Sequence, residues 1–324
     1  MKVTNLFLTT LLTTIPALAQ KTDSTAIAAG KAITSKFPTT RVFDLQYQQS
    51  GPSDYTTKVL GNVFEKETIQ NHSRLKAAAN INLYKSKSQR FFITNSFRYK
   101  YESFSFGTIQ NATTIFSRPD ADFHYFANAV SGTYFGQLFK KNVIYNATAT
   151  VDADQYHFQR VKGMVSAVML IKKTERTTFT LGALFSIDPS AIIPFVPIAT
   201  YEYQFKDSPW KLDFILPQRF LVKRPLFENG RLSLGTEMAS ENFYLSLNTD
   251  AFKGTYELNE LALRSGITYE HALGKNFIGT FKGGIANVLS SRITERGERT
   301  NHYVIDNKQD AHLYFNAGVS YNPF

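Results

Sequence analysis

The sequence lacks cysteine, has a single tryptophan and contains no long apolar run beyond its N-terminus. The absence of cysteine excludes disulfide scaffolds, thiolate zinc sites and cysteine nucleophiles. A membrane-spanning helix needs about 20 consecutive apolar residues. The longest apolar stretch after the N-terminus, Ala191 to Ala199, has only nine residues and contains Pro194 and Pro197. A bundle of membrane helices is therefore excluded.

Aromatic residues are abundant instead, with 28 Phe and 17 Tyr among 324 residues. They supply far more apolar surface than a solvated, disordered chain could leave exposed. Basic residues outnumber acidic ones by 36 to 26, which gives a net charge of +10. Because the basic residues are spread along the chain rather than gathered in one stripe, nucleic-acid binding is disfavoured.

The N-terminus predicts the compartment. Met1 and Lys2 precede an apolar, Thr-rich stretch over 3–15, and small residues at Ala17 and Ala19 form a signal-peptidase site. We expect a signal peptide over 1–19, a mobile periplasmic segment over 20–40 and one folded unit over 41–324. The alternative, a buried or anchoring helix, is too short to span a membrane and is interrupted by Pro16.

From residue 41 onward, apolar and polar residues alternate with a period of two, which predicts β-strands with two different faces. In Arg74 to Tyr84, for example, Leu75, Ile81 and Leu83 share one face, and Lys76 and Asn82 share the other. The segments that fit are 41–49, 74–84, 90–102, 123–135, 143–152, 160–171, 177–187, 195–205, 210–216, 219–226, 231–248, 258–271, 277–289 and 310–322. They predict about 14 strands, or 12 if 210–226 is read differently, because a hairpin and one long strand both fit there.

The connections and the aromatic residues favour a membrane barrel. Short connections such as 85–89 and 272–276 alternate with long ones at 50–73, 103–122 and 290–309, as in outer-membrane barrels. Aromatic residues mark strand ends, as interfacial girdles require: Phe91, Tyr101, Phe123, Phe135, Trp210 and Phe277. A soluble sandwich or lipocalin-like barrel would alternate too, with its apolar face inward. We predict an all-β fold, a transmembrane antiparallel up-and-down β-barrel with periplasmic termini.

Two stretches carry a resemblance. The signal peptide, the strand pattern and the ending from Gly318 to Phe324 look like a Gram-negative outer-membrane β-barrel, and the terminal Phe324 resembles the signal read by the barrel-assembly machinery. The run from Trp210 to Arg219, followed by Leu232 to Gly235, is similar to an uncharacterised barrel family, a domain of unknown function, found in Bacteroidota. The resemblance covers residues 41 to 324. It implies fold and location in the outer membrane, and it implies no activity or site residue.

Charged residues predicted to face the lumen suggest a passage. The candidates that would line it are Arg74, Lys76, Arg98, Lys100, Glu102, Lys162, Lys211, Asp213, Arg264 and Lys282. A lumen with excess positive charge favours anions, so we expect a passive or weakly anion-selective pore or transporter for small solutes. Alternatively, these charges pair across neighbouring strands and plug a structural barrel.

An enzyme embedded in the barrel is the less favoured class. None of the six His residues stands in a His-x-Ser arrangement, and acidic residues near a His at an outer rim occur only at Asp120, Asp122 and His124, and at Asp152 and Asp154. Such a set could serve an omptin-like protease or bind Ca²⁺, but Asp in outer loops is ordinary turn chemistry. We therefore predict no enzyme, no cofactor and no metal site.

The loop over 290–309 is the candidate binding surface. Its Arg292, Arg296 and Arg299 suit phosphate groups such as those of lipopolysaccharide. The alternative is that they pair with Glu295 and Glu298 in a solvated loop. The expected partners are outer-membrane lipid, lipopolysaccharide, the barrel-assembly machinery and small solutes.

Overall fold

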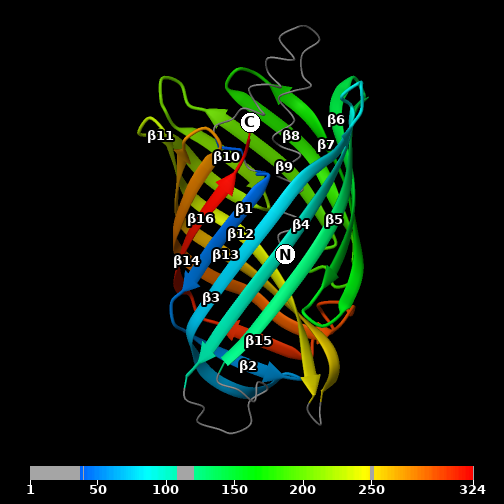
Figure 1. Cartoon of the computed structure of the whole chain (residues 1–324), viewed down its shortest axis with the longest axis vertical. Helices are drawn as coiled ribbons and strands as arrows, with labels where there is room; N and C mark the ends of the chain where they lie inside the picture. The colour runs from blue at the N-terminus through cyan, green and yellow to red at the C-terminus, as the bar shows by residue number, and fades with distance from the viewer. Residues whose placement is uncertain (1–36, 39, 108–119, 249–251, 324) are drawn as a thin grey trace.

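Strands that alternate in polarity form one closed antiparallel β-barrel in the computed structural model (Figure 1). The structure describes residues 37–38, 40–107, 120–248 and 252–323. The predicted signal peptide, most of the 20–40 segment and Phe324 lie outside these residues, so the expectations about them stay predictions. Within the described residues, no helix is long and apolar enough to cross a membrane.

Within the described residues, sixteen strand segments make up the wall. They are β1 (Phe43–Ser50), β2 (Ser53–Val59), β3 (Asn62–Lys85), β4 (Phe91–Phe106), β5 (Asp120–Leu138), β6 (Lys141–Ala153), β7 (Phe158–Lys173), β8 (Thr177–Ile187), β9 (Phe195–Gln204), β10 (Lys211–Leu216), β11 (Arg219–Leu226), β12 (Gly230–Asn248), β13 (Lys253–Leu273), β14 (Phe277–Glu295), β15 (Ile305–Gln309) and β16 (His312–Tyr321). Each of the predicted strand segments overlaps one of these strands, and 210–226 is a hairpin.

The segments fill 14 wall positions because two positions are each shared by two segments. β1 and β2 both pair with β3 and are separated at Gly51 and Pro52. On the neighbouring position, β16 pairs with β1 and β14, and β15 pairs with β2 and β14. The break falls where Pro52 has no N–H to donate to a ladder. The predicted count of 14 strands is confirmed, and the barrel closes between the first and last strands.

The two faces of the wall have opposite character. On β4, Phe97 is 45% exposed on the outer face, whereas Ser96 and Arg98 are 2% and 7% exposed on the inner face. Other large apolar residues on the outer face include Leu45, Val130, Leu181, Phe220 and Phe281. A soluble barrel would carry its apolar face inward, so the observed polarity is that of a barrel surrounded by an apolar medium.

Aromatic residues gather on the outer surface at the end of the barrel where β1 begins and β16 ends. Tyr321 lies between Phe43 and Phe277, with ring centroids 6.2 and 5.2 Å away. This cluster matches the expected girdle. Phe123 and Phe135, however, do not belong to a girdle: Phe135 is buried and Phe123 packs against the interior clusters. Both side chains pack toward the interior, which strand position alone does not reveal.

The two ends of the barrel differ. Figure 1 shows the C-terminus and the β10–β11 hairpin at one end, and β2 and β15 at the other. At the second end, strands extend into the expected long loops: β3 begins at Asn62, β4 continues to Phe106 and β14 continues to Glu295. We call these the short-turn end and the long-loop end.

The wall is low on one side. β8, β9, β10 and β11 have 11, 10, 6 and 8 residues, whereas β7, β12 and β13 have 16, 19 and 21. Spanning a membrane takes about 9–11 residues per strand, so β12 and β13 are about twice as long as required. The ladder between β11 and β12 ends at the pair Arg219 and Glu237. Farther toward the long-loop end, β13 is the only one of the described strands that pairs with β12.

The surplus length of β12 and β13 folds into the lumen. Residues 241–245 of β12 are all buried, so neither face of the strand is exposed there. Phe243 and Tyr244 pack against Phe123 and Tyr125 of β5, with ring centroids 6.1 and 6.3 Å apart. Since β5 lies seven wall positions from β12, these contacts cross the barrel. We call residues 239–248 and 253–261 the lid.

Exchanging one outer residue for a charge tests which face meets lipid. Phe97→Arg is expected to lower the free energy of unfolding by about 2–4 kcal/mol, because it places a cation in the apolar part of the bilayer. The measurement is urea unfolding of the barrel in lipid vesicles. Phe97→Leu, which stays apolar, serves as the control, and an equally stable Phe97→Arg barrel would contradict the outward assignment.

Candidate functional site

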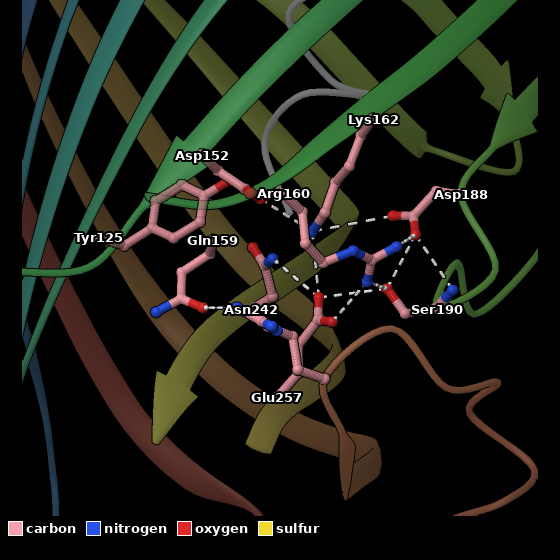
Figure 2. Close-up of polar contacts among 10 residues, drawn as sticks. Tyr125, Asp152, Gln159, Arg160, Lys162, Asp188, Ser190, Asn242 and Glu257 are labelled. Carbon is pink, nitrogen blue, oxygen red and sulfur yellow. Dashed lines mark hydrogen bonds and ion pairs between the residues drawn. The ribbon is translucent and has the colours of Figure 1, made fainter. Parts of the chain in front are cut away.

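Glu257 on the lid binds the opposite wall (Figure 2). Its side chain is 0% exposed, with Oε2 2.8 Å from Arg160 Nη1 and Oε1 3.0 Å from Lys162 Nζ, both on β7. The hydroxyl of Ser190, in the β8–β9 connection, donates to Oε1 at 3.2 Å. A single carboxylate therefore joins the lid, β7 and a loop of the low wall.

Two more carboxylates complete this first network. Asp188 pairs with Arg160 and lies 3.7 Å from Lys162 Nζ. Asp152 is 2.9 Å from the same Nζ and accepts a hydrogen bond of 3.2 Å from the Tyr125 hydroxyl. Three carboxylates thus surround two cations. Ions taken out of water are stable only when paired and hydrogen-bonded in this way.

Glu241 organises a second network on the other side of the lid. It pairs with Lys76 and lies 3.3 Å from Arg74 Nη1, 3.2 Å from Lys100 Nζ and 3.7 Å from Arg264 Nη2. Arg74 and Lys76 belong to β3, and Lys100 to β4. One buried carboxylate on the lid is therefore shared by cations from two strands of the far wall.

Lys100 reinforces the attachment. Its Nζ donates to the backbone carbonyl of Asn242 at 2.9 Å and lies 4.3 and 4.6 Å from the ring centroids of Phe243 and Tyr125. Cation–π contacts are strongest where the cation is desolvated. Next to it, Glu102 pairs with Arg74 and lies 3.0 Å from His72 Nε2. The lid is thus tied to β3, β4 and β7 by charge and to β5 by aromatic packing.

An apolar layer covers the lid toward the long-loop end. Leu245, Leu247 and Tyr256 of the lid cluster with Ile293 of β14 and Ile305 of β15. Burial of such side chains contributes about 1.5–3 kcal/mol each. The lid therefore fills the lumen where this apolar layer lies.

A basic cavity of about 260 Å³ lies within the barrel, lined by residues of β1, β3, β4, β5, β11, β12, β13, β14 and β16. Nine basic and four acidic side chains line it. These are Arg41, Lys76, Arg98, Lys100, Arg219, Lys223, Arg231, Arg264 and Lys282, with Asp44, Glu237, Glu241 and Glu270. The lining is therefore net positive.

Most of these cations have carboxylate partners. Glu270 pairs with Arg41 and Arg231. Glu237 lies 3.0 Å from Lys282 Nζ. Asp213, a predicted lumen residue, pairs with Lys223 and lies 3.0 Å from Arg219 Nη2. Pairing of this kind is what the structural-barrel alternative expects, but it leaves the cavity with an excess of cations.

The chain just before β1 enters the lumen. Phe37 packs against Ala272 and Ile278, and its carbonyl accepts a hydrogen bond of 3.2 Å from Arg231. The Arg231 guanidinium also lies 5.0 Å from the Phe37 ring centroid. Phe37 therefore belongs to the lumen at its short-turn end.

The predicted lumen residues all lie on the inner face or in the networks described above. Arg74, Lys76, Lys100, Glu102 and Lys162 meet the lid or its partners. Lys211 differs from the others, because it pairs with Glu202 at 2.6 Å and its side chain is 42% exposed. Arg98, Asp213, Arg264 and Lys282 surround the basic cavity, Asp213 through its partners.

The predicted acidic sets of the outer rim lie on opposite faces of the wall. Asp120 and Asp122 are exposed; Asp122 accepts a hydrogen bond of 3.0 Å from Tyr101, and His124 Nδ1 lies 2.9 Å from the hydroxyl of Tyr99. Tyr99 and Tyr101 share the outward face of β4 with Phe97, so this set faces away from the lumen.

The second set belongs to the interior. Asp152, expected at the rim, is instead 0% exposed and pairs with Lys162. Asp154 is also buried and accepts hydrogen bonds from the backbone of Tyr156 and His157, as turn residues do. The strand wall thus separates the two sets, and they form no joint site. Among the described residues, no group of three or more His, Cys, Asp or Glu side chains could hold a metal ion.

The three arginines of 290–309 face different partners. Arg292 lies 3.4 Å from Asp306 Oδ1 and 4.5 Å from the Tyr303 ring centroid. Arg296 donates to Gln159 Oε1 at 3.0 Å, and Arg299 is exposed. Arg292 therefore contacts partners within 290–309 itself, whereas Arg296 contacts β7.

The central carboxylates were not among the predicted site residues. Glu241 lies inside a predicted strand, Glu257 falls one residue before one, and Asp188 falls in a connection. The available signal was length: a predicted strand of 231–248 is far longer than the 9–11 residues that spanning requires.

No protein-family model and no curated protein matches the sequence. Solved structures with a similar fold are outer-membrane proteins. An outer membrane channel from Pseudomonas putida F1 has a TM-score of 0.39 at 12% identity, over 86% of this chain and 94% of that one. A Pseudomonas aeruginosa FadL homologue has 0.30 at 9%, over 90% and 92%. The transport unit of the autotransporter AIDA-I from Escherichia coli has 0.30 at 9%, over 98% of each chain.

These similarities assign no function to this chain, because identity and TM-scores are low. The resemblance of residues 210–219 and 232–235 to a Bacteroidota family stays a prediction. The residues of the lumen are therefore the basis for a proposed function.

Removing the Glu257 carboxylate tests the first network. Glu257→Ala leaves Arg160 and Lys162 with one buried partner fewer, so the free energy of unfolding is expected to fall by roughly 3–5 kcal/mol. The measurement is urea unfolding in vesicles, followed by the fluorescence of Trp210. The matched control is Glu298→Ala, whose exposed pair with His302 contributes below about 1 kcal/mol. Equal losses in both variants would contradict a buried anchor.

Proposed function

We propose that this protein is an outer-membrane barrel that passes small solutes, and that the lid gates the passage. The observation that carries the proposal is the lid itself, which fills the lumen through residues that a spanning strand does not need. The outward apolar face supports a membrane location, and the predicted signal peptide supports export. Insertion by the barrel-assembly machinery through Phe324, and contact with lipopolysaccharide, belong to the same proposal.

The geometry supports a lid that moves. Among the described residues, the part of β12 in the lid pairs with no strand other than β13, and the low wall of β8–β11 lies beside that edge. The β13–β14 ladder shifts register between Leu261 and Ala262, where the lid begins. Bulges bend strands at defined points. Motion about this bulge would break the contacts of Glu241 and Glu257 without separating β12 from β13. Because residues 256–261 of the lid also pair with residues 290–295 of β14, that end of β14 would move with the lid.

Cross-linking the lid to the wall tests the gate. The chain has no native cysteine, so Phe123→Cys and Phe243→Cys introduce the only thiols, on facing positions whose rings pack together. Joined by a reversible bis-methanethiosulfonate reagent, the double variant is expected to carry no current in a planar bilayer, and reduction is expected to restore discrete conductance steps. The lid must leave β5 for solutes to pass.

The two single-cysteine variants, treated in the same way, control for the reagent. Current that persists through the cross-linked barrel would show that the lid is not the gate. Silence from the reduced, correctly folded barrel would favour the alternative of a plugged structural barrel.

The basic cavity gives the passage a preference for anions, because excess positive charge in a low-dielectric lumen concentrates negative solutes. Replacing Arg98 and Lys282 together with Glu is expected to shift the reversal potential under a salt gradient toward cation selectivity. Arg90→Glu, an exposed change at a short turn, is the control. Unchanged ion selectivity in the double variant would remove the role of the lumen charges.

A further inference from the structure

Arg98 differs from the other cations of the basic cavity. Each of the other eight lies within 4.0 Å of a described carboxylate. Arg98 is only 7% exposed, and neither Nη1 nor Nη2 has a hydrogen-bond partner among the described residues. Two buried guanidinium nitrogens without an acceptor cost free energy, because they have lost their hydration and gained no partner.

The surrounding strands explain why Arg98 has room and no neighbour to bind. At its level of the wall, the paired residues are Ala78 on β3 and Ala127 on β5. Ala239 of the lid also lines the cavity. Methyl side chains at these positions leave space around the guanidinium and provide no acceptor.

The charge around Arg98 favours a negatively charged ligand. Four carboxylates line the cavity against nine cations, and Glu241 alone is shared by four cations. An anion bound here would reduce an excess of positive charge in a region of low dielectric, where electrostatic interactions are strong.

We propose that Arg98 is the recognition residue of a binding site for the oxyanion group of a small solute, a carboxylate or a phosphate. The planar guanidinium offers two parallel N–H donors, which match both groups. The cavity of about 260 Å³ lies just below the usual range for ligand pockets, about 300–1,000 Å³, so the solute is small. This site deepens the proposed function by naming the chemistry of the solute. The site lies in the cavity beside the lid. A solute bound there therefore reports binding, whether or not the solute passes through the barrel.

Binding to the folded barrel in zwitterionic detergent tests the site. Inorganic phosphate and acetate are titrated separately at constant ionic strength, with isothermal titration calorimetry as the readout and chloride as the reference anion. At least one of the two oxyanions is expected to bind saturably, and Arg98→Gln is expected to weaken that binding about tenfold or more, since it removes the charged bidentate donor. Arg98→Lys keeps the charge but loses the two parallel donors, so its affinity is expected to lie between those of the unmodified protein and Arg98→Gln.

Arg90 is an exposed arginine just before β4. The matched control is Arg90→Gln, which should bind like the unmodified protein. Phosphate binding without acetate binding would indicate a tetrahedral oxyanion, and the reverse a carboxylate. Absence of saturable binding for both, or equal binding by Arg98→Gln, would overturn the site. Because the titration needs no conductance, its failure leaves the gated passage standing, and a silent barrel that binds oxyanions through Arg98 leaves the site standing.

Discussion

Two buried carboxylates on the lid, Glu241 and Glu257, determine how the lumen is arranged. Each reaches cations on the opposite wall, Glu241 on β3 and β4, and Glu257 on β7. Without them, these buried cations would each lose a carboxylate partner, which costs far more than an exposed pair gains. The aromatic contacts with β5 and the apolar layer around Ile305 follow from the position that these ion pairs hold.

This attachment suits the gate that we propose, in which the lid is held firmly in one position and can still leave it. Apolar packing alone depends little on direction, whereas each carboxylate is satisfied only in a narrow geometry. A lid held by two such groups has one well-defined closed position. If it moves away, Glu241, Glu257 and their partners gain water in exchange, so the two positions can differ by little free energy even though the closed contacts are strong. The low wall beside β12 provides the room.

The basic cavity extends the same reasoning to the solute. Most of its cations are satisfied by carboxylates of the wall, so the wall itself determines which charge is left over. That remainder is concentrated at Arg98, between alanines that provide no acceptor. In the passage that we propose, the preference for anions comes from the excess positive charge of this lining, with Arg98 as its unpaired member, rather than from the net charge of the chain.

The period of two determined the fold from the sequence alone, because side chains alternate across any extended strand regardless of its partners. Residues such as Phe97 and Arg98 could therefore be assigned to opposite faces, and the strand count and the inner position of Lys162 followed. The lid could not be predicted in this way. Whether Glu257 faces lipid, water or Lys162 depends on the bend of a hairpin and on a residue 95 positions away, and no local pattern records either. The inward folding of β12, the burial of Asp152 and the isolation of Arg98 were decided only when the wall closed, because each depends on what stands across the barrel.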